Sequence, residues 1–271
     1  DHMDYLGNTL AEIAAEKAGI IKRGVPIIAA PQKSDASSVI ERAAARARAP
    51  LYLGGADWSV VQEHGRLVFQ DNDGLLDLPQ PRLPGRHQFI NAGTAIATAR
   101  ATGLITDTAA IEAGVTAAEW PGRLQRLTHG KIVEAAPRDA EVWLDGGHNA
   151  DGGEAVATAM ADLEERVSRP LFLIAGMLST KDPVNYFRAF NGLARHIFTV
   201  RVPGVSTAIE AAALADAAEA GDMSAEPVAS VKTALRLLAE NWRFEPPPRI
   251  LICGSLYLVG DVLAQNGTPP R

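Results

Sequence analysis

The second half of the chain alternates short apolar runs with segments of helical periodicity. The apolar runs have the length of buried strands and are expected at residues 141–145, 171–175, 196–200 and 249–253. The helical patterns follow them at residues 153–165, 183–191, 208–219, 231–240 and 256–264. Apolar strands that alternate with helices are typical of a parallel sheet with helices on both faces. This half is therefore predicted to be a doubly wound α/β domain.

The first half of the chain has a mixed pattern. A helix is predicted over residues 9–18, because Thr9 and Glu12 form a capping box and Gly19 is a natural stop. The remaining elements are expected to be a strand at 25–30, a helix at 35–48, a small antiparallel sheet within 57–78, and helices at 88–102 and 108–118. The pattern changes at Pro121-Gly122-Arg123, and this change predicts two domains.

Composition argues against several classes of protein. With 47% hydrophobic and 21% charged residues over 271 positions, the chain is an ordinary globular sequence. Its net charge of -6 argues against a broad nucleic-acid surface. The longest strongly apolar stretch, residues 171–178, is far short of the roughly 20 residues that cross a bilayer. We therefore expect neither a nucleic-acid partner nor a membrane partner.

The cysteine content and the first residues bear on compartment and completeness. Cys253 is the single cysteine, so it forms no internal disulfide, which favours a reducing, cytoplasmic setting. The chain opens on Asp1-His2, without a signal-peptide pattern or an initiating methionine. We therefore expect a fragment or a processed form.

Lys17 is the most informative irregularity of the first half. Leu10, Ile13, Ala14 and Lys17 fall on one face of the first predicted helix, so a lysine continues an apolar stripe. A cation in the last turn favours the helix dipole, and its stem can cover apolar surface. Alternatively, desolvation leaves Lys17 as a neutral, reactive amine. The pattern alone leaves both interpretations open.

Several residues are candidates for binding a ligand. Asp145 ends an apolar strand at the carboxyl edge of the predicted sheet, where ligands bind in such folds. Arg123 follows a Pro-Gly turn, and its guanidinium offers a planar fork of donors that matches phosphate. His148 and Asn149 follow in a glycine-bearing turn and are expected to face the same side. His2, between two acidic residues, is by its spacing alone typical of a surface histidine.

A series of short motifs runs in order along nearly the whole chain. They are Asp1-His2-x-x-x-Leu6-Gly7 with Ile13-Ala14-x-x-Lys17-Ala18-Gly19-Ile20, Leu83-Pro-Gly-Arg-His-Gln88 with Asn91-Ala92, Trp120-Pro-Gly-Arg123, Leu144-Asp-Gly-Gly-His-Asn149 and Cys253-Gly-Ser-Leu-Tyr-Leu-Val-Gly260. Together they resemble the folylpolyglutamate and dihydrofolate synthases, which are ATP-dependent ligases of the Mur ligase superfamily. The resemblance implies the C-terminal part of an ATP-binding central domain at 1–122, a hinge at 123–130 and a Rossmann-like ligase domain at 131–271.

The resemblance also implies a role for each candidate residue. Asn91 would contact the adenine end of ATP, and it shares a helical face with His87. Arg123 would hold phosphate oxygens, and Asp145 would bind the ribose hydroxyls. His148 would handle the incoming glutamate.

The implied metal site lies near the first residues. His2 would be a ligand of Mg²⁺ near the terminal phosphates of ATP, and Lys17 would be carbamylated to organise that site. The family's glycine-rich Gly-Lys-Ser loop has no counterpart, because Gly130-Lys131 lacks the required earlier glycine and the following hydroxyl residue. The chain by itself is therefore expected to be inactive.

The function implied is ligation of L-glutamate to dihydropteroate, to (poly)glutamylated tetrahydrofolate or to both, through an acyl phosphate, by a monomeric enzyme. A Mur-type ligase for a cell-wall precursor and a non-catalytic nucleotide-binding fragment are the alternatives. A nicotinamide-dependent dehydrogenase is disfavoured, because the chain lacks the Gly-x-Gly-x-x-Gly motif.

Overall fold

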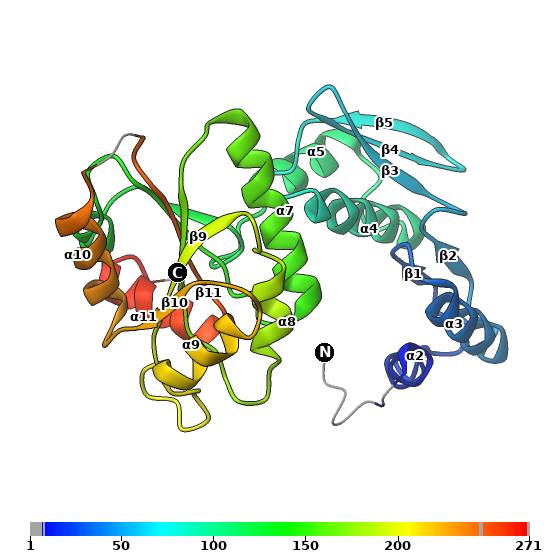
Figure 1. Ribbon diagram of the computed structural model, residues 1–271. Coiled ribbons are helices and arrows are strands. Elements are labelled where there is room, and N and C mark those ends of the chain that lie inside the picture. Colours follow the sequence, from blue (N-terminus) through cyan, green and yellow to red (C-terminus); the bar gives the residue numbers. More distant parts are fainter. Residues whose placement is uncertain (1–6, 8, 244–245, 270–271) are drawn as a thin grey trace. The chain divides into compact units, whose positions relative to one another are not determined.

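The computed structural model describes residues 7, 9–243 and 246–269. The chain divides into two compact units between Glu119 and Trp120 (Figure 1). Each unit buries hydrophobic side chains of its own.

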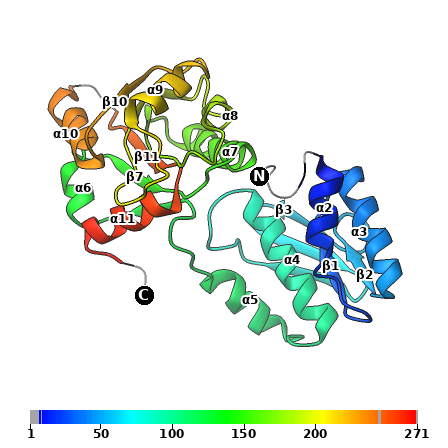
Figure 2. The ribbon, with the colours of Figure 1, turned by 90° about the horizontal axis from the view of Figure 1, so that it is seen from below.

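The first unit combines helices with two small sheets. In chain order its elements are α2 (Leu10–Ala18), β1 (Ile27–Ala29), α3 (Ser34–Ala47), β2 (Leu51–Leu53), β3 (Ser59–Glu63), β4 (Arg66–Asp71), β5 (Gly74–Leu78), α4 (His87–Thr102) and α5 (Thr108–Ala117). β1 and β2 pair in parallel, and β3, β4 and β5 form an antiparallel sheet. α2 lies beside α3 (Figure 2). Leu67 and Phe69 of β4 pack with Phe89 and Ile96 of α4, because strand alternation and one helix face present apolar groups to a shared core.

The predicted start and end of the first helix are confirmed. The Thr9 hydroxyl accepts a hydrogen bond from the backbone N–H of Glu12 at 3.2 Å. The Glu12 carboxylate accepts one from the backbone N–H of Thr9 at 3.0 Å. Gly19 follows as the C-cap. Local sequence therefore fixes both ends of α2.

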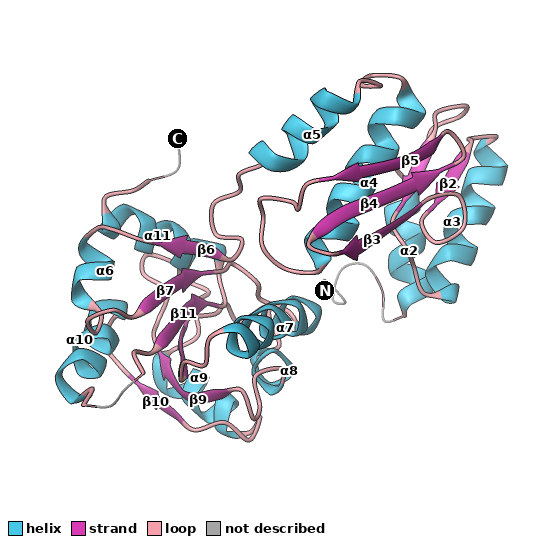
Figure 3. Cartoon of the chain, turned by 90° about the horizontal axis from the view of Figure 1, so that it is seen from above, coloured by secondary structure: helices cyan, strands magenta, loops and turns pink. Residues whose placement is uncertain are grey.

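The second unit is built on a six-stranded sheet in the order β10-β9-β8-β11-β7-β6. Figure 3 labels β6, β7, β9, β10 and β11 of this sheet. In chain order its elements are β6 (Gln125–Leu127), α6 (Lys131–Ala135), β7 (Glu141–Leu144), α7 (Ala150–Arg166), β8 (Leu171–Ala175), α8 (Pro183–Arg188), β9 (Ala194–Thr199), α9 (Ala211–Glu219), β10 (Ala225–Pro227), α10 (Val231–Asn241), β11 (Arg249–Cys253) and α11 (Leu256–Asn266). Every neighbouring pair of strands is parallel except β6 with β7. The predicted α/β architecture is confirmed.

Helices cover both faces of this sheet. On one face, Met160 of α7 and Leu214 of α9 belong to the core that contains Leu251 of β11. On the other face, Leu235 of α10 and Val262 of α11 join the second core. The chain therefore passes from β7 and β8 to helices on one face, but from the intervening β11 to a helix on the other. Such a reversal is the switch point at whose carboxyl edge ligands bind in open α/β sheets.

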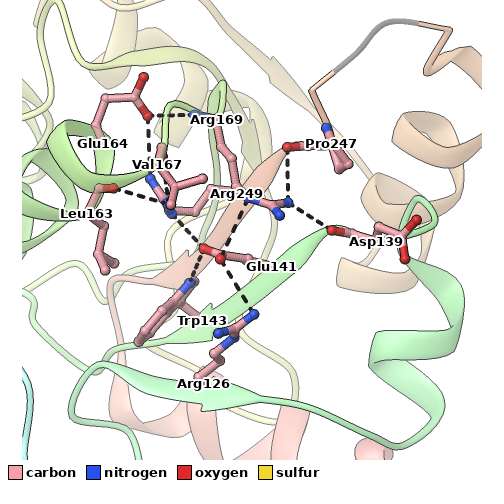
Figure 4. Close-up of polar contacts among 10 residues, drawn as sticks. All are labelled: Arg126, Asp139, Glu141, Trp143, Leu163, Glu164, Val167, Arg169, Pro247 and Arg249. Atoms are coloured by element: carbon pink, nitrogen blue, oxygen red, sulfur yellow. Dashed lines mark hydrogen bonds and ion pairs between the residues drawn. The ribbon is translucent and has the colours of Figure 1, made fainter.

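A buried ion-pair cluster holds the opposite, amino edge of the sheet (Figure 4). Arg249, the first residue of β11, has a side chain only 2% exposed. Its Nε donates to Glu141 Oε2 at 2.9 Å, and its Nη1 to Glu164 Oε2 at 3.4 Å. Its Nη2 donates to the carbonyl of Val167 at 3.2 Å, where α7 ends. We call Arg249, Glu141 and Glu164 the Arg249 cluster; it joins the starts of β7 and β11 to the end of α7.

The cluster lowers the pKa of both carboxyl groups. Burial raises the pKa of Glu141, but the hydrogen bond and charge of Arg249, with the Trp143 indole and Arg126, outweigh it. Burial likewise raises the pKa of Glu164, and hydrogen bonds and the Arg249 charge again outweigh it. Both groups are therefore stabilised in their ionised form.

Some elements differ from the sequence predictions. β2, α6, β6 and β10 were not predicted, because segments of three to five residues are too short to show a periodic pattern. The helix expected from residue 208 begins at Ala211. Its expected first turn is instead held by the β8 loop, because Ile209 N–H donates to the carbonyl of Met177 at 2.9 Å. Residues 125–127, expected within a hinge, pair with β7 in the sheet.

No helix in the described part of the chain is long and apolar enough to span a membrane.

Candidate functional site

The carboxyl edge of the second unit's sheet brings together three of the predicted site residues. β6 runs antiparallel to β7 with Gln125 opposite Leu144. The residues before β6 therefore lie beside those that follow β7. The Gly146 N–H donates to the carbonyl of Gly122 at 2.8 Å, which joins the loop carrying Arg123 to the loop carrying Asp145 and His148.

Asp145 is fixed in place by backbone donors. Its side chain is buried, and Oδ2 accepts from the N–H of Leu124 at 2.9 Å. Oδ1 accepts from the N–H of Gly147 at 2.6 Å. Leu124 has a left-handed backbone with φ of 43°, which is uncommon for a non-glycine residue and often marks a functional site. Both loops are therefore built around the Asp145 carboxylate.

His148 has a defined tautomer in this loop. Its Nδ1 lies 2.8 Å from the carbonyl oxygen of Gly146. A carbonyl oxygen only accepts hydrogen bonds, so Nδ1 carries the hydrogen. In the neutral imidazole, Nε2 then bears a lone pair and can accept a proton.

Asn149 has a structural role that the sequence did not assign. Its side-chain oxygen accepts from the N–H of Gly152 at 2.8 Å and caps the amino end of α7. A cap of this kind typically stabilises a helix by about 1 kcal/mol. Asn149 therefore sets where the loop ends and the helix begins.

Arg123 is half-buried at the same edge. It follows Gly122, whose φ of +72° is in the left-handed region that glycine favours. Within the described residues, its guanidinium makes no ion pair or hydrogen bond. The fork of donors is therefore available to an anionic ligand.

The thiol below this edge is not a nucleophile. Cys253 is fully buried at the end of β11, whose neighbour β7 leads into Asp145. Burial raises the pKa of Cys253 to about 12, and the nearby Asp145 acts in the same direction. A thiol kept protonated in this way is a packing group.

In the first unit, Asn91 lies on α4 beside a pocket. Asn91 Nδ2 donates to Gln88 Oε1 at 3.0 Å, and Gln88 Nε2 lies 2.9 Å from His87 Nε2. The pocket has a volume of about 330 Å³, and Gln88 and Asn91 are the polar members of a lining that is otherwise apolar. A mostly apolar pocket with a few polar groups is typical of small-molecule sites. The contact of Asn91 with adenine stays a prediction.

The predicted metal site is not assembled by the described residues. Lys17 is exposed in the last turn of α2, so the described residues do not bury it as the neutral-amine interpretation requires. Its position fits a cation that favours the helix dipole. His2 lies outside the described residues. No group of three or more His, Cys, Asp or Glu side chains in residues 7, 9–243 and 246–269 could hold a metal ion.

The sheet and its edge define a class of protein. The second unit is a doubly wound α/β domain that presents a fixed carboxylate, a histidine and an arginine at its topological switch point. Comparison with known proteins narrows this class. Residues 128–265 match the family described as "Dihydrofolate synthetase, C-terminal domain". The chain belongs to the folylpolyglutamate and dihydrofolate synthase family.

Individual relatives agree with this assignment. The folylpolyglutamate synthase of Lacticaseibacillus casei is 30% identical over 97% of this chain and 59% of its own length. The dihydrofolate synthase/folylpolyglutamate synthase of Bacillus subtilis gives the same identity and coverage. The chain therefore spans about three-fifths of these relatives.

Solved structures share the fold. Escherichia coli FolC in complex with DHPP and ADP superposes with a TM-score of 0.82 at 26% identity, over 97% of this chain and 58% of that one. Mycobacterium tuberculosis folylpolyglutamate synthase complexed with ADP and AMPPCP also has a TM-score of 0.82 at 26% identity. The match covers all of this chain and 62% of that one.

Proposed function

We propose that the protein ligates L-glutamate to dihydropteroate, to a reduced folate or to both, at the expense of ATP. In the first step the pterin substrate's carboxylate attacks the γ-phosphorus of ATP, so an acyl phosphate forms and ADP leaves. In the second step the glutamate amine attacks the acyl carbon, loses a proton and displaces inorganic phosphate. Relatives carry both activities in their names, and the E. coli relative was solved with DHPP and ADP.

The observation that carries the proposal is the carboxyl edge around Asp145. A buried carboxylate held by two backbone N–H groups is an acceptor in a fixed position, which suits the hydroxyls of a ribose. Arg123, whose guanidinium is not engaged by the described residues, supplies donors and positive charge for phosphate oxygens. The two lie on loops joined by the bond from Gly146 to Gly122.

His148 supports the second step. Because its Nδ1 donates to Gly146, its Nε2 can accept a proton from the glutamate ammonium or from the attacking amine. A base is needed there, because only the unprotonated amine is nucleophilic. We assign this role to His148, with Gly146 as the group that sets its tautomer.

We propose Mg²⁺ as the metal that accompanies ATP, since a related structure from Yersinia pestis was solved with AMPPNP and a Mn ion. Such a metal neutralises phosphate charge. The described residues offer no cluster of metal ligands, so we assign no step of this chain's chemistry to it. The roles of His2 as a ligand and of Lys17 as a carbamylated residue remain predictions.

ADP release by the full-length gene product tests the proposal. The assay contains Mg-ATP and glutamate, with and without dihydropteroate or tetrahydrofolate, and a parallel set replaces the pterin with a cell-wall precursor. We expect release that requires both glutamate and a pterin. Release with the cell-wall precursor alone, or binding of ATP without any release, would contradict the proposal.

A further inference from the structure

The motif from Cys253 to Gly260 has no role in the proposed reaction, yet it adjoins the site. It forms the end of β11, the turn at Gly254 and the start of α11. The Ser255 side chain is buried, and its Oγ accepts from the N–H of Tyr257 at 3.1 Å, which fixes the first turn of α11. Leu256, the first residue of that helix, is 45% exposed.

Two glycines pack against one face of α11: Gly122, in the loop that carries Arg123, and Gly146, in the loop that carries Asp145 and His148. We call these two loops the site loops. A Cβ added at Gly146 would meet the Leu256 side chain, with Cγ at 2.8 Å, and would lie 3.4 Å from Arg123 Nη1. A Cβ added at Gly122 would lie 2.6 Å from Val259 Cγ1. Leu256 and Val259 are three residues apart, so they share a face of the helix. Both site loops therefore pack on the first turns of α11.

We propose that Leu256 is a positioning residue for Arg123, an inference that rests on the proposed function. The end of the Leu256 side chain and the Arg123 guanidinium flank the same point above Gly146. No ion pair from the described residues fixes this guanidinium, so packing restricts its rotamers. The Leu256 side chain blocks rotamers that would move the Arg123 guanidinium away from the loop that carries Asp145. Because nearly half of its side chain is exposed, Leu256 has little role in holding the core.

A double-mutant cycle in the full-length gene product tests this inference. The variants are Leu256→Ala, Arg123→Gln, their combination and Leu256→Met, with Leu75→Ala as the control, because Leu75 is a leucine 59% exposed on β5. Steady-state ADP release, AMPPNP affinity and Tm are measured for each. We expect Leu256→Ala to lower kcat/KM roughly tenfold or more without a change in Tm. Leu256→Met, which keeps the length and apolar character, should restore most of the loss.

The double variant, Leu256→Ala with Arg123→Gln, shows whether Leu256 acts through Arg123 or affects activity independently of it. If Leu256 acts through Arg123, the double variant is no worse than Arg123→Gln alone. The inference is overturned if the two losses multiply, or if Leu256→Ala matches the wild type while Arg123→Gln is impaired.

Binding separates this inference from the proposed function. If the wild type binds AMPPNP but releases no ADP, the proposed ligation fails. The AMPPNP affinities of the wild type, the two single variants and the double variant then still show whether Leu256 positions Arg123. If the wild type neither binds AMPPNP nor releases ADP, both proposals are wrong.

Discussion

Asp145 depends on being an acceptor at both oxygens. Replacement by asparagine puts an amide N–H₂ opposite one of the two backbone donors, Leu124 or Gly147, so one of those bonds is lost. We expect Asp145→Asn to raise the KM for ATP roughly tenfold and to leave kcat less affected. Steady-state kinetics of the full-length gene product check this. Asp216→Asn, at an exposed position of α9, is the control and should behave as the wild type. An unchanged KM in a folded Asp145→Asn variant would remove Asp145 from the nucleotide site.

A side chain at position 146 would occupy the space that the Leu256 side chain fills. Shortening Leu256 should therefore compensate for adding a methyl group at position 146. Gly146 is outside the left-handed region, and its backbone therefore tolerates alanine. Gly146→Ala alone forces the Leu256 side chain to move, and activity should fall. In Gly146→Ala with Leu256→Ala, the new methyl group lies 3.4 Å from Arg123 Nη1, so it can take over the positioning role proposed for Leu256. The double variant is therefore expected to exceed Leu256→Ala alone in kcat/KM. A double variant that is worse than either single one would show that the methyl group does not take over this role.

At the scale of elements, the Arg249 cluster joins β7, β11 and α7. Arg249→Met removes the cation but keeps most of the volume, and it leaves Glu141 buried without its closest partner. Breaking a buried pair in this way costs about 3–5 kcal/mol. We expect a Tm lower by on the order of 10 °C in thermal unfolding followed by circular dichroism. Arg138→Met is the matched control, because Arg138 is 95% exposed and its pair with Asp139 is a surface contact.

The same cluster predicts an acid-sensitive step in stability. The pKa values of Glu141 and Glu164 are lowered in the folded state, below an ordinary value of 4.5. Their stabilisation is therefore complete above the unfolded pKa, and it is lost as the pH falls through the folded pKa. We expect unfolding free energy, measured by urea titration, to decline below about pH 4.5. Arg249→Met should show a shallower decline. An equal slope in both proteins would show that other carboxyl groups dominate.

At the scale of the whole molecule, the division at Glu119 predicts a unit that folds alone. All six strands of the larger sheet and the helices on both its faces lie within residues 120–271. We expect a protein of residues 120–271 to unfold in one cooperative transition, monitored by near-ultraviolet circular dichroism. Arg249→Met should lower its Tm as much as in the longer chain. A broad transition without near-ultraviolet signal would show that the unit needs the preceding residues.

Segments with a strong periodic pattern were predicted correctly, whereas segments too short to show a period were not. The runs at 171–175 and 249–253 are strands with the predicted bounds, because all of their positions except Phe172 are buried. β6 and β10 were missed, because three residues show no alternation and their pairing comes from partners elsewhere in the chain. A hydrophobic pattern within a segment therefore predicts the longer strands, but not short strands that form by pairing with distant parts of the chain.

The sequence allowed the site residues to be predicted, but not the backbone donors and packing contacts that hold them in place. Asp145 could be placed from the strand that it ends, and His148 from the turn that follows. The donors to Asp145, by contrast, are the N–H groups of Leu124 and Gly147, and no side-chain pattern reveals a backbone donor. The contact of Leu256 with Gly146 joins residues that are far apart in the chain, so only the fold brings it out. The sequence also did not show that Lys17 is exposed.

The place of β11 in the sheet has a consequence for synthesis. β11 is the last strand of the described chain, yet it lies between β8 and β7. As the nascent polypeptide leaves the ribosome, β8, β9 and β10 can associate early, but nothing bridges them to β7 until residue 253 has emerged. Until then, the edges of β7 and β8 that later pair with β11 expose unpaired backbone groups. Until residue 253 has emerged, the nascent chain is therefore expected to be open to edge-to-edge strand pairing with other chains.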